Sequence, residues 1–356
     1  MKFILLFISI VFIYPALLAQ EKPAAKLSGY MFGDFFYNVA RDTSIGSMSN
    51  TATGGVQDLN GFQFRRIYLT YDGDISPTFT SRLRLEGSVG SPFIKDAYIK
   101  WKNIFNGSDL VFGLQPTPAF EVSETIWGYR SLEKTILDLR GIVSPRDLSV
   151  SLRGKIDEQG MLGYWIMFGN NSSIGSESDK YKRLYGHLQI LPAEKILLTV
   201  YADYKMQRAV NDLKSTSTPK ATLNHNVLTT ALFAGYSEKG SFNAGVEGFL
   251  QSTPNDFKDG SPDSLVTKNS IGVSIFGSVN VGGDLTLVGR YDFFDPNTHS
   301  KAAGDVRNYF IFGADWKADK NVSIIPNIQY EMYEEAGGRS FDPSLTARVT
   351  LFYTFL

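Results

Sequence analysis

The 356-residue sequence contains no cysteine and three histidines. The lack of cysteine excludes disulfides, thiol nucleophiles and cysteine-ligated metals, and we expect no cofactor. Beyond the amino-terminal segment, no stretch stays apolar for about 18 residues, as a membrane-spanning helix requires. The net charge of −1 gives no reason to expect a nucleic-acid partner. Aromatic residues, by contrast, make up 13% of the chain, which suits β-structure and aromatic girdles at membrane interfaces.

The amino-terminal segment has the pattern of a secretory signal peptide. A lysine precedes an apolar run over residues 3–14, and Ala19 supplies a small residue at the cleavage position. The polar Gln20 that follows argues against a retained membrane anchor. We therefore expect residues 1–19 to be removed and residues 20–26 to form a short extension.

From residue 27 onward, the sequence predicts about sixteen strands whose connections alternate between short and long. The short connections, rich in turn-forming residues, are 76–77, 106–107, 158–160, 192–194, 239–240, 282–283 and 319–320. The long ones are 40–60, 116–145, 170–180, 207–225, 252–267, 296–305 and 334–343, with a brief one at 90–93. A barrel through a membrane keeps short turns at one end and long loops at the other, because its ends face different compartments. We therefore predict an all-β fold, a transmembrane antiparallel β-barrel of the bacterial outer membrane, over residues 27–356.

Within single strands, apolar and polar residues alternate as they must in a wall between lipid and water. In the last strand, Val349 and Leu351 share the apolar face, whereas Arg348 and Thr350 lie on the polar face. The segments that divide in the same way are 78–88, 94–102, 196–205 and 322–331. Segments 161–169, 226–236 and 306–318 alternate less clearly, which leaves the strand count open by two.

The connection at residues 116–145 is unusual for an exposed loop. Ser123 is a possible helix cap, and apolar residues follow at roughly helical spacing. These apolar anchors are Trp127, Leu132, Ile136 and Leu139. A segment with an apolar face must bury it, and a barrel about sixteen strands wide has free space in its lumen. We expect a short helix here and an inward-folded third loop that narrows the channel; the alternative is a loop on the rim or against a neighbouring subunit.

Several stretches around the third loop carry distinct motifs: 61–69 (GFQFRRIYL), 94–101 (IKDAYIKW), 112–116 (FGLQP), the loop segment 121–132 and Arg146-Asp147-Leu148. Together they resemble the phosphate-selective porin O and P family. The resemblance covers residues 27–155 by motif and the remainder by barrel pattern alone. It implies a trimeric, sixteen-stranded outer-membrane channel whose third loop folds into the pore, with an arginine ladder for anions in some members. The chain departs from that family in ending on Leu356, where a terminal aromatic is usual, and in its slightly acidic balance.

Basic residues gather on the strands around the third loop. By alternation, those facing inward are Arg66, Arg82, Arg84, Lys100 and Arg153, and the loop itself carries Arg130, Lys134 and Arg140. Guanidinium groups along a narrow path attract phosphate, carboxylate or sulfate and offer them forked hydrogen bonds. The nearby acidic residues that can neutralise them include Glu86, Asp96 and Glu121. The sequence thus leaves open an anion-preferring pore and a weakly selective one.

We expect an outer-membrane porin, in contact with lipid, for passive diffusion of small hydrophilic solutes, with a possible preference for anions such as phosphate. A barrel-embedded hydrolase and a structural or adhesion barrel are the alternatives. His187, His225 and His299 stand at no diagnostic spacing from a nucleophile. Aspartates in residues 255–260 and 295–297 could hold calcium but fit solvated turns better.

Overall fold

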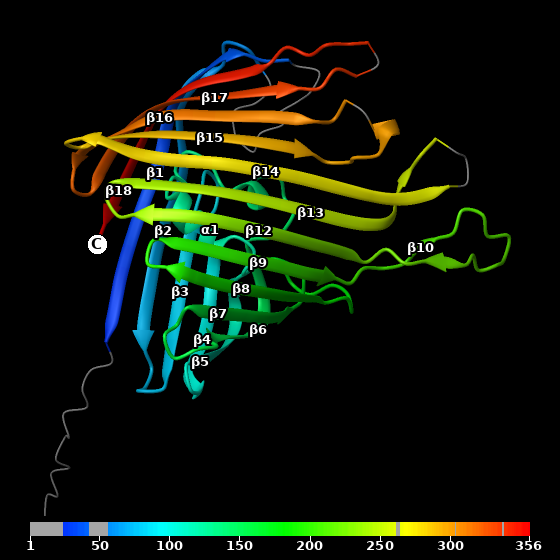
Figure 1. The fold of residues 1–356 in the computed structure, drawn as a ribbon, viewed down its shortest axis with the longest axis horizontal. Helices are drawn as coiled ribbons and strands as arrows, with labels where there is room; N and C mark the ends of the chain where they lie inside the picture. Colours follow the sequence, from blue (N-terminus) through cyan, green and yellow to red (C-terminus); the bar gives the residue numbers. More distant parts are fainter. Residues whose placement is uncertain (1–23, 43–55, 261–263, 303, 337) are drawn as a thin grey trace, which may run out of the picture.

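In a computed structural model, which describes residues 24–356 apart from 43–55, 261–263, 303 and 337, the chain forms a closed antiparallel barrel of sixteen strands (Figure 1). The barrel strands are β1 (Ala25–Ala40), β2 (Asn60–Asp74), β3 (Phe79–Gly87), β4 (Phe93–Phe105), β5 (Ser108–Pro116), β6 (Arg146–Lys155), β7 (Leu162–Gly169), β8 (Arg183–Ala193), β9 (Ile196–Lys205), β12 (Val227–Glu238), β13 (Phe242–Lys258), β14 (Leu265–Gly282), β15 (Leu285–Asp295), β16 (Arg307–Asp319), β17 (Val322–Tyr333) and β18 (Ser344–Phe355). The shorter elements are α1 (Glu121–Trp127), α2 (Ile136–Leu139), a 3-10 turn (Ser300–Ala302) and a hairpin of β10 (Val210–Asn211) and β11 (Thr222–Leu223). The predicted fold class and strand number are confirmed.

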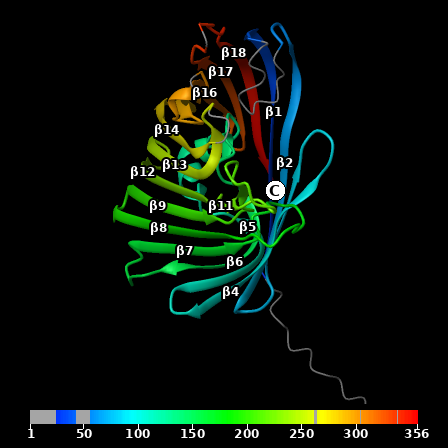
Figure 2. The ribbon, with the colours of Figure 1, turned by 90° about the vertical axis from the view of Figure 1, so that its right-hand side faces the viewer.

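Closure of the barrel joins the two ends of the chain. β1 pairs with β2 on one side and with β18 on the other, and Figure 2 shows β1 and β18 side by side. The wall therefore has no free edge strand that could pair with another chain. β1 begins at Ala25, two residues before the expected start, whereas the predicted signal segment lies outside the described residues.

The connections alternate as predicted, with two boundary corrections. Residues 252–258 extend β13 and residues 265–267 begin β14, so the connection between them covers only 259–264. The sequence predicted a loop because residues 252–258 are polar. In the structure, β13 and β14 stay paired through this polar segment. The turn after β8 lies at residues 194–195 rather than 192–194, because Pro192 and Ala193 still belong to the strand. The three weakly alternating segments form β7, β12 and β16.

The two faces of the wall differ as alternation predicted. Val349 and Leu351 are 45% and 43% exposed on the outside, whereas Thr350 between them is fully buried on the inside. Arg348 is likewise buried. Elsewhere the outer face carries large apolar side chains, among them Leu83, Ile99, Val200, Leu232 and Ile328. No helix in the described ranges is long and apolar enough to cross a membrane.

Candidate functional site: the constriction in the barrel lumen

The third loop leaves the wall after β5 and returns to it at β6. Its base is closed by Thr117, whose hydroxyl donates to the Ser144 carbonyl at 2.7 Å and whose N–H donates to the Pro145 carbonyl at 3.2 Å. Gly128 ends α1 in the left-handed region at φ 70°, a conformation that glycine adopts without steric cost. A clamped base and a sharp turn direct the loop across the lumen.

Helix α1 begins one turn earlier than the predicted cap. Phe120 occupies the N-cap position, so Ser123 is not a cap. The Ser123 hydroxyl instead lies within hydrogen-bonding distance of the Phe120 carbonyl at 3.3 Å and of Glu247 Oε1 on β13 at 2.7 Å. The serine therefore fastens the helix to the barrel wall.

Apolar packing holds the loop inside the barrel. The predicted anchors Trp127, Leu132, Ile136 and Leu139 are all at most 3% exposed. They belong to two clusters with inward-facing wall residues, which include Trp165, Tyr201, Phe249, Phe276, Ile311 and Ile325. Each buried side chain of this size contributes about 1.5–3 kcal/mol relative to exposure. The loop thus packs in the lumen, as predicted, and not on the rim.

Hydrogen bonds to the loop backbone fix its position from several strands. Arg65 on β2 donates to the Ser131 carbonyl at 2.6 Å, and Gln329 on β17 donates to the Leu132 carbonyl at 3.2 Å. Arg290 on β15 donates to the Lys134 carbonyl. Because these strands lie on different parts of the wall, the loop is held across the lumen rather than at one edge.

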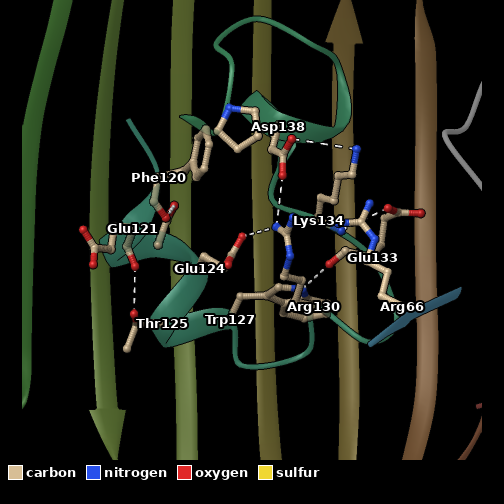
Figure 3. A network of polar contacts seen from close by, with 12 residues as sticks. Arg66, Phe120, Glu121, Glu124, Thr125, Trp127, Arg130, Glu133, Lys134 and Asp138 are labelled. Carbon is tan, nitrogen blue, oxygen red and sulfur yellow. Dashed lines mark hydrogen bonds and ion pairs between the residues drawn. The ribbon is translucent and has the colours of Figure 1, made fainter. Parts of the chain in front are cut away.

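Arg130 borders two of the cavities that remain in the lumen. It lines a cavity of about 320 Å³ together with Arg66 and Glu86, and also a cavity of about 510 Å³ on the other side of the loop. Its guanidinium pairs with Glu124 and, at 3.0 Å, with Asp138 (Figure 3). Lys134 reaches the same Asp138 at 3.8 Å. The loop side of the constriction is therefore a compact network of two cations and two carboxylates.

The predicted inward cations on the wall each pair with a carboxylate, except Arg153, which stacks on an aromatic ring. Arg82 holds Asp72 with two hydrogen bonds of 2.6 and 3.0 Å, and Arg66 pairs with Glu86 at 3.1 Å. Arg84 lies 3.6 Å from Asp96. The other predicted wall cations are Lys100, 3.6 Å from Asp109, and Arg153, whose guanidinium lies 4.9 Å from the Trp165 ring centroid. The wall is a ladder of ion pairs, not a row of bare cations.

Two predicted site residues are placed differently from the rest. Arg140 pairs with Glu331 at 2.9 Å, and its side chain is 1% exposed. It packs against the rings of Phe294 and Tyr309, so it faces the barrel wall instead of the open lumen. Glu121 lines two cavities beneath the loop rather than the constriction itself.

Two wall cations escaped the sequence reasoning because β-bulges interrupt the alternation. The register between β1 and β2 shifts beside Arg65, and that between β3 and β4 shifts beside Lys95. A bulge places consecutive residues on the same face, so Arg65 accompanies Arg66 and Lys95 accompanies Asp96 into the lumen. Adjacent charged pairs in an otherwise alternating strand were the available signal, since strict alternation would place one of each pair in lipid.

With these residues included, three carboxylates on the wall are each shared by two cations. Glu86 contacts Arg66 and Lys95. Asp96 contacts Arg84 and Arg146, and Asp34 contacts Arg65 and Arg348. Within the part of the chain that the structure describes, each of these groups carries an excess of one positive charge. Strands β13 and β16 differ, because their carboxylates Glu247 and Asp315 meet the loop hydroxyls of Ser123 and Tyr129.

The histidines and loop aspartates occupy ordinary settings. His225 lies 3.4 Å from Asp256, and His299 packs against Phe257, while His187 faces inward on β8. Residues 255–258 lie in β13 and are not the turn that the sequence suggested. Among the described residues, no group of three or more histidine or acidic side chains has metal-binding geometry.

No protein-family model matches the sequence, and no curated protein matches it. Several solved structures, however, are similar to this chain. The chain is similar to outer-membrane expressed OmpT of Vibrio cholerae, at 12% identity and a TM-score of 0.62, over 94% of this chain and 98% of that one. It is also similar to an anion-selective porin from Comamonas acidovorans, at 14% identity and a TM-score of 0.63, over 94% and 100%. A third similar structure is the outer membrane channel DcaP of Acinetobacter baumannii, at 12% identity and a TM-score of 0.64, over 94% and 98%. At these identities the likeness shows the sixteen-stranded porin fold, and the phosphate-selective family stays a prediction.

Proposed function

We propose that the protein is a porin of the bacterial outer membrane that lets small hydrophilic solutes diffuse passively, with a preference for anions. The apolar outer face fits lipid, and the inner face is charged and hydrated, as a membrane channel of this architecture requires. The similar solved structures include proteins described as an outer membrane channel and as a porin.

The anion preference rests on the shared carboxylates of the wall. Glu86, Asp96 and Asp34 each neutralise one of two cations, so the wall facing Arg130 keeps a positive excess. Fixed charge near the narrowest section acts through little intervening water and so biases permeation more than charge at a wide mouth. The cavity of about 320 Å³ is lined by Arg65, Arg66, Arg130 and Lys134 against Glu86 and Glu133, and this cation-rich lining suits an oxyanion such as phosphate.

Planar-bilayer recording under a salt gradient tests both parts of this proposal. We expect steady open channels whose zero-current potential indicates anion preference, together with block of the chloride current by phosphate. A barrel without conductance would favour the hydrolase or adhesion alternatives. Steady conductance with cation preference would leave a general diffusion porin and would point to Glu247 and Asp315 as the dominant charges.

Charge reversal on the wall should change the selectivity. In the double variant Arg82→Glu and Arg84→Glu, the zero-current potential is expected to shift toward cation preference. The shift should shrink in high salt, because the screening length falls from about 10 Å at 0.1 M to about 3 Å at 1 M. The matched control reverses Lys239 and Lys320, which carry the same charge but lie exposed in turns at the end of the barrel. If both double variants gave the same zero-current potential, the proposed anion preference would be wrong.

A homotrimer that packs through the short strands is part of the proposal. β5 and β7 have nine and eight residues, at or below the roughly 9–11 that span a bilayer. Their outer face exposes Phe112 (67%), Ile166 (52%) and Phe168 (47%). A neighbouring subunit would cover this low part of the wall better than lipid does, and a trimer form is described for OmpT of Vibrio cholerae.

The subunit contact can be tested by an outward-facing charge. Phe112→Arg is expected to convert trimers to monomers in mild detergent, because a desolvated arginine at a subunit contact has no partner. Native mass spectrometry measures the change. Phe312→Arg is the control, because Phe312 is 54% exposed on β16, away from β5–β7, and that variant should stay trimeric. Monomers in the wild type would exclude the trimer.

A further inference from the structure

A cavity of about 740 Å³ lies between α1 and strands β6–β9, apart from the constriction at Arg130. The helix contributes Val122 and Ile126 to its lining, and the wall contributes Trp165, His187 and Leu197. Its volume falls within the roughly 300–1,000 Å³ typical of small-molecule sites. The cavity therefore combines aliphatic and aromatic side chains with charged ones.

Pairing between neighbouring strands places inward-facing side chains in one row across the sheet, and this row forms one side of the cavity. Arg153 on β6 pairs with Trp165 on β7, which pairs with His187 on β8, which pairs with Tyr201 on β9. The guanidinium of Arg153 lies 4.9 Å from the centre of the Trp165 ring. Directly paired residues on one face are close neighbours. Of this row, Arg153, Trp165 and His187 line the cavity and present an aromatic surface with a cation at one end, opposite aliphatic side chains of α1.

The Trp165 indole carries an unused hydrogen-bond donor. Trp165 is 7% exposed, and its Nε1 has no hydrogen-bond partner among the described residues. Indole N–H groups only donate, and a buried donor without a partner is unfavourable. This N–H is itself enclosed, so a carboxylate in the cavity meets the cations of the lining and not the indole nitrogen.

The charges that line the cavity favour an anion. The cations Lys100, Arg153 and Lys155 face the carboxylates Asp109 and Glu121. Lys100 and Asp109 pair with each other at 3.6 Å, so two cations stand against the single carboxylate of Glu121. Arginine binds carboxylates through two parallel hydrogen bonds and also stacks on aromatic rings.

We propose that this cavity binds aromatic monocarboxylates. The ring of the ligand packs against Trp165 beneath Val122 and Ile126, and its carboxylate meets Arg153 and Lys155. The site deepens the proposed function and rests on it for the route by which the ligand arrives, since the cavity lies inside the barrel and shares Lys100, Glu121 and Arg153 with a neighbouring cavity.

Isothermal titration calorimetry on the purified barrel tests the site with three probes: benzoate, acetate and benzyl alcohol. Benzoate is expected to bind at least about tenfold more tightly than either of the others, because acetate lacks the ring and benzyl alcohol lacks the charge. If benzoate and acetate bound with equal affinity, the charge of the cavity alone would account for binding. Equal affinities for benzoate and benzyl alcohol would reduce the cavity to an apolar slot. Either result overturns the proposal.

Two variants locate the ligand in the cavity. Trp165→Leu should weaken benzoate about 3- to 10-fold, the range for an aromatic pair, and Arg153→Gln should weaken benzoate while leaving benzyl alcohol unchanged. Trp316→Leu is the matched control, because Trp316 is 53% exposed on the outer face of β16. Faster migration in unboiled gels shows that each variant is folded. Unchanged benzoate affinity in Trp165→Leu would place the ligand elsewhere.

The calorimetry separates this proposal from the porin proposal, because it requires no current. If the barrel conducts but binds benzoate no better than acetate, the proposed aromatic site is wrong and the porin proposal stands. A barrel that binds benzoate with the expected selectivity and conducts nothing removes the porin function alone.

Discussion

Deleting residues 122–139 is expected to raise the single-channel conductance several fold while the barrel still assembles. This segment contains α2, all of α1 except Glu121, and the anchors Trp127 and Ile136, which pack against the inner wall. Ionic conductance grows with the open area of the narrowest section, and the deletion removes Arg130 and its network from that section. Bilayer recording gives the conductance, and retention of faster migration in unboiled gels shows that the strands still close.

A second deletion serves as the matched control for the first. The connection between β9 and β12 carries the β10–β11 hairpin, which projects beyond the end of the barrel (Figure 1). Removing residues 209–224 shortens this connection without touching the lumen, so the conductance should stay at the wild-type value. If the deletion of 122–139 also left the conductance unchanged, the third loop would not be the barrier to current.

Replacing Val349 with arginine is expected to cost about 2–4 kcal/mol of folding free energy if this residue lies near the bilayer midplane. Val349 is 45% exposed on the outer face, near the middle of β18. A charged side chain there meets hydrocarbon and finds no hydrogen-bond partner. Denaturant unfolding in lipid vesicles, followed by tryptophan fluorescence, measures the difference.

The structure also changes the choice of control for this experiment. Alternation alone suggests Thr350 as a tolerant inward site, but its hydroxyl contacts Asp34 and accepts from Asn327 at 3.0 Å. Arginine at Thr350 would break this buried network, so it would be costly for another reason. Thr286 on β15, which lines the 510 Å³ cavity, is the better inward control. Equal losses for Val349→Arg and Thr286→Arg would mean that the outer face is not in lipid.

Local features of the sequence predicted most of the fold. Alternation with period two and turn residues such as Gly107 and Gly240 depend on a few neighbouring positions, so they can be recognised without knowledge of partners. The inward loop was predictable for the same reason, because an apolar helical segment between polar strands has to be buried somewhere. Strand ends were less predictable where polar strands run on beyond the expected turn, as in residues 252–258.

The details of the constriction could not be predicted in this way. Arg65 and Lys95 turn inward only because bulges shift the register between neighbouring strands, and register is a property of the pair. Arg140 belongs to the loop and is basic, yet docking of the loop buries it against Glu331 on β17.

The sequence by itself determined a closed β-barrel with an inward third loop and a basic surface around it, because these follow from the order of residue types along each strand. Tertiary structure alone decided which cation shares which carboxylate, which cavities Arg130 borders, and that Arg153, Trp165 and His187 form one row. The physical reason is that charge and packing act through space at a few ångströms. These distances join residues far apart in the chain, and they are set only when sixteen strands pair and the loop docks among them.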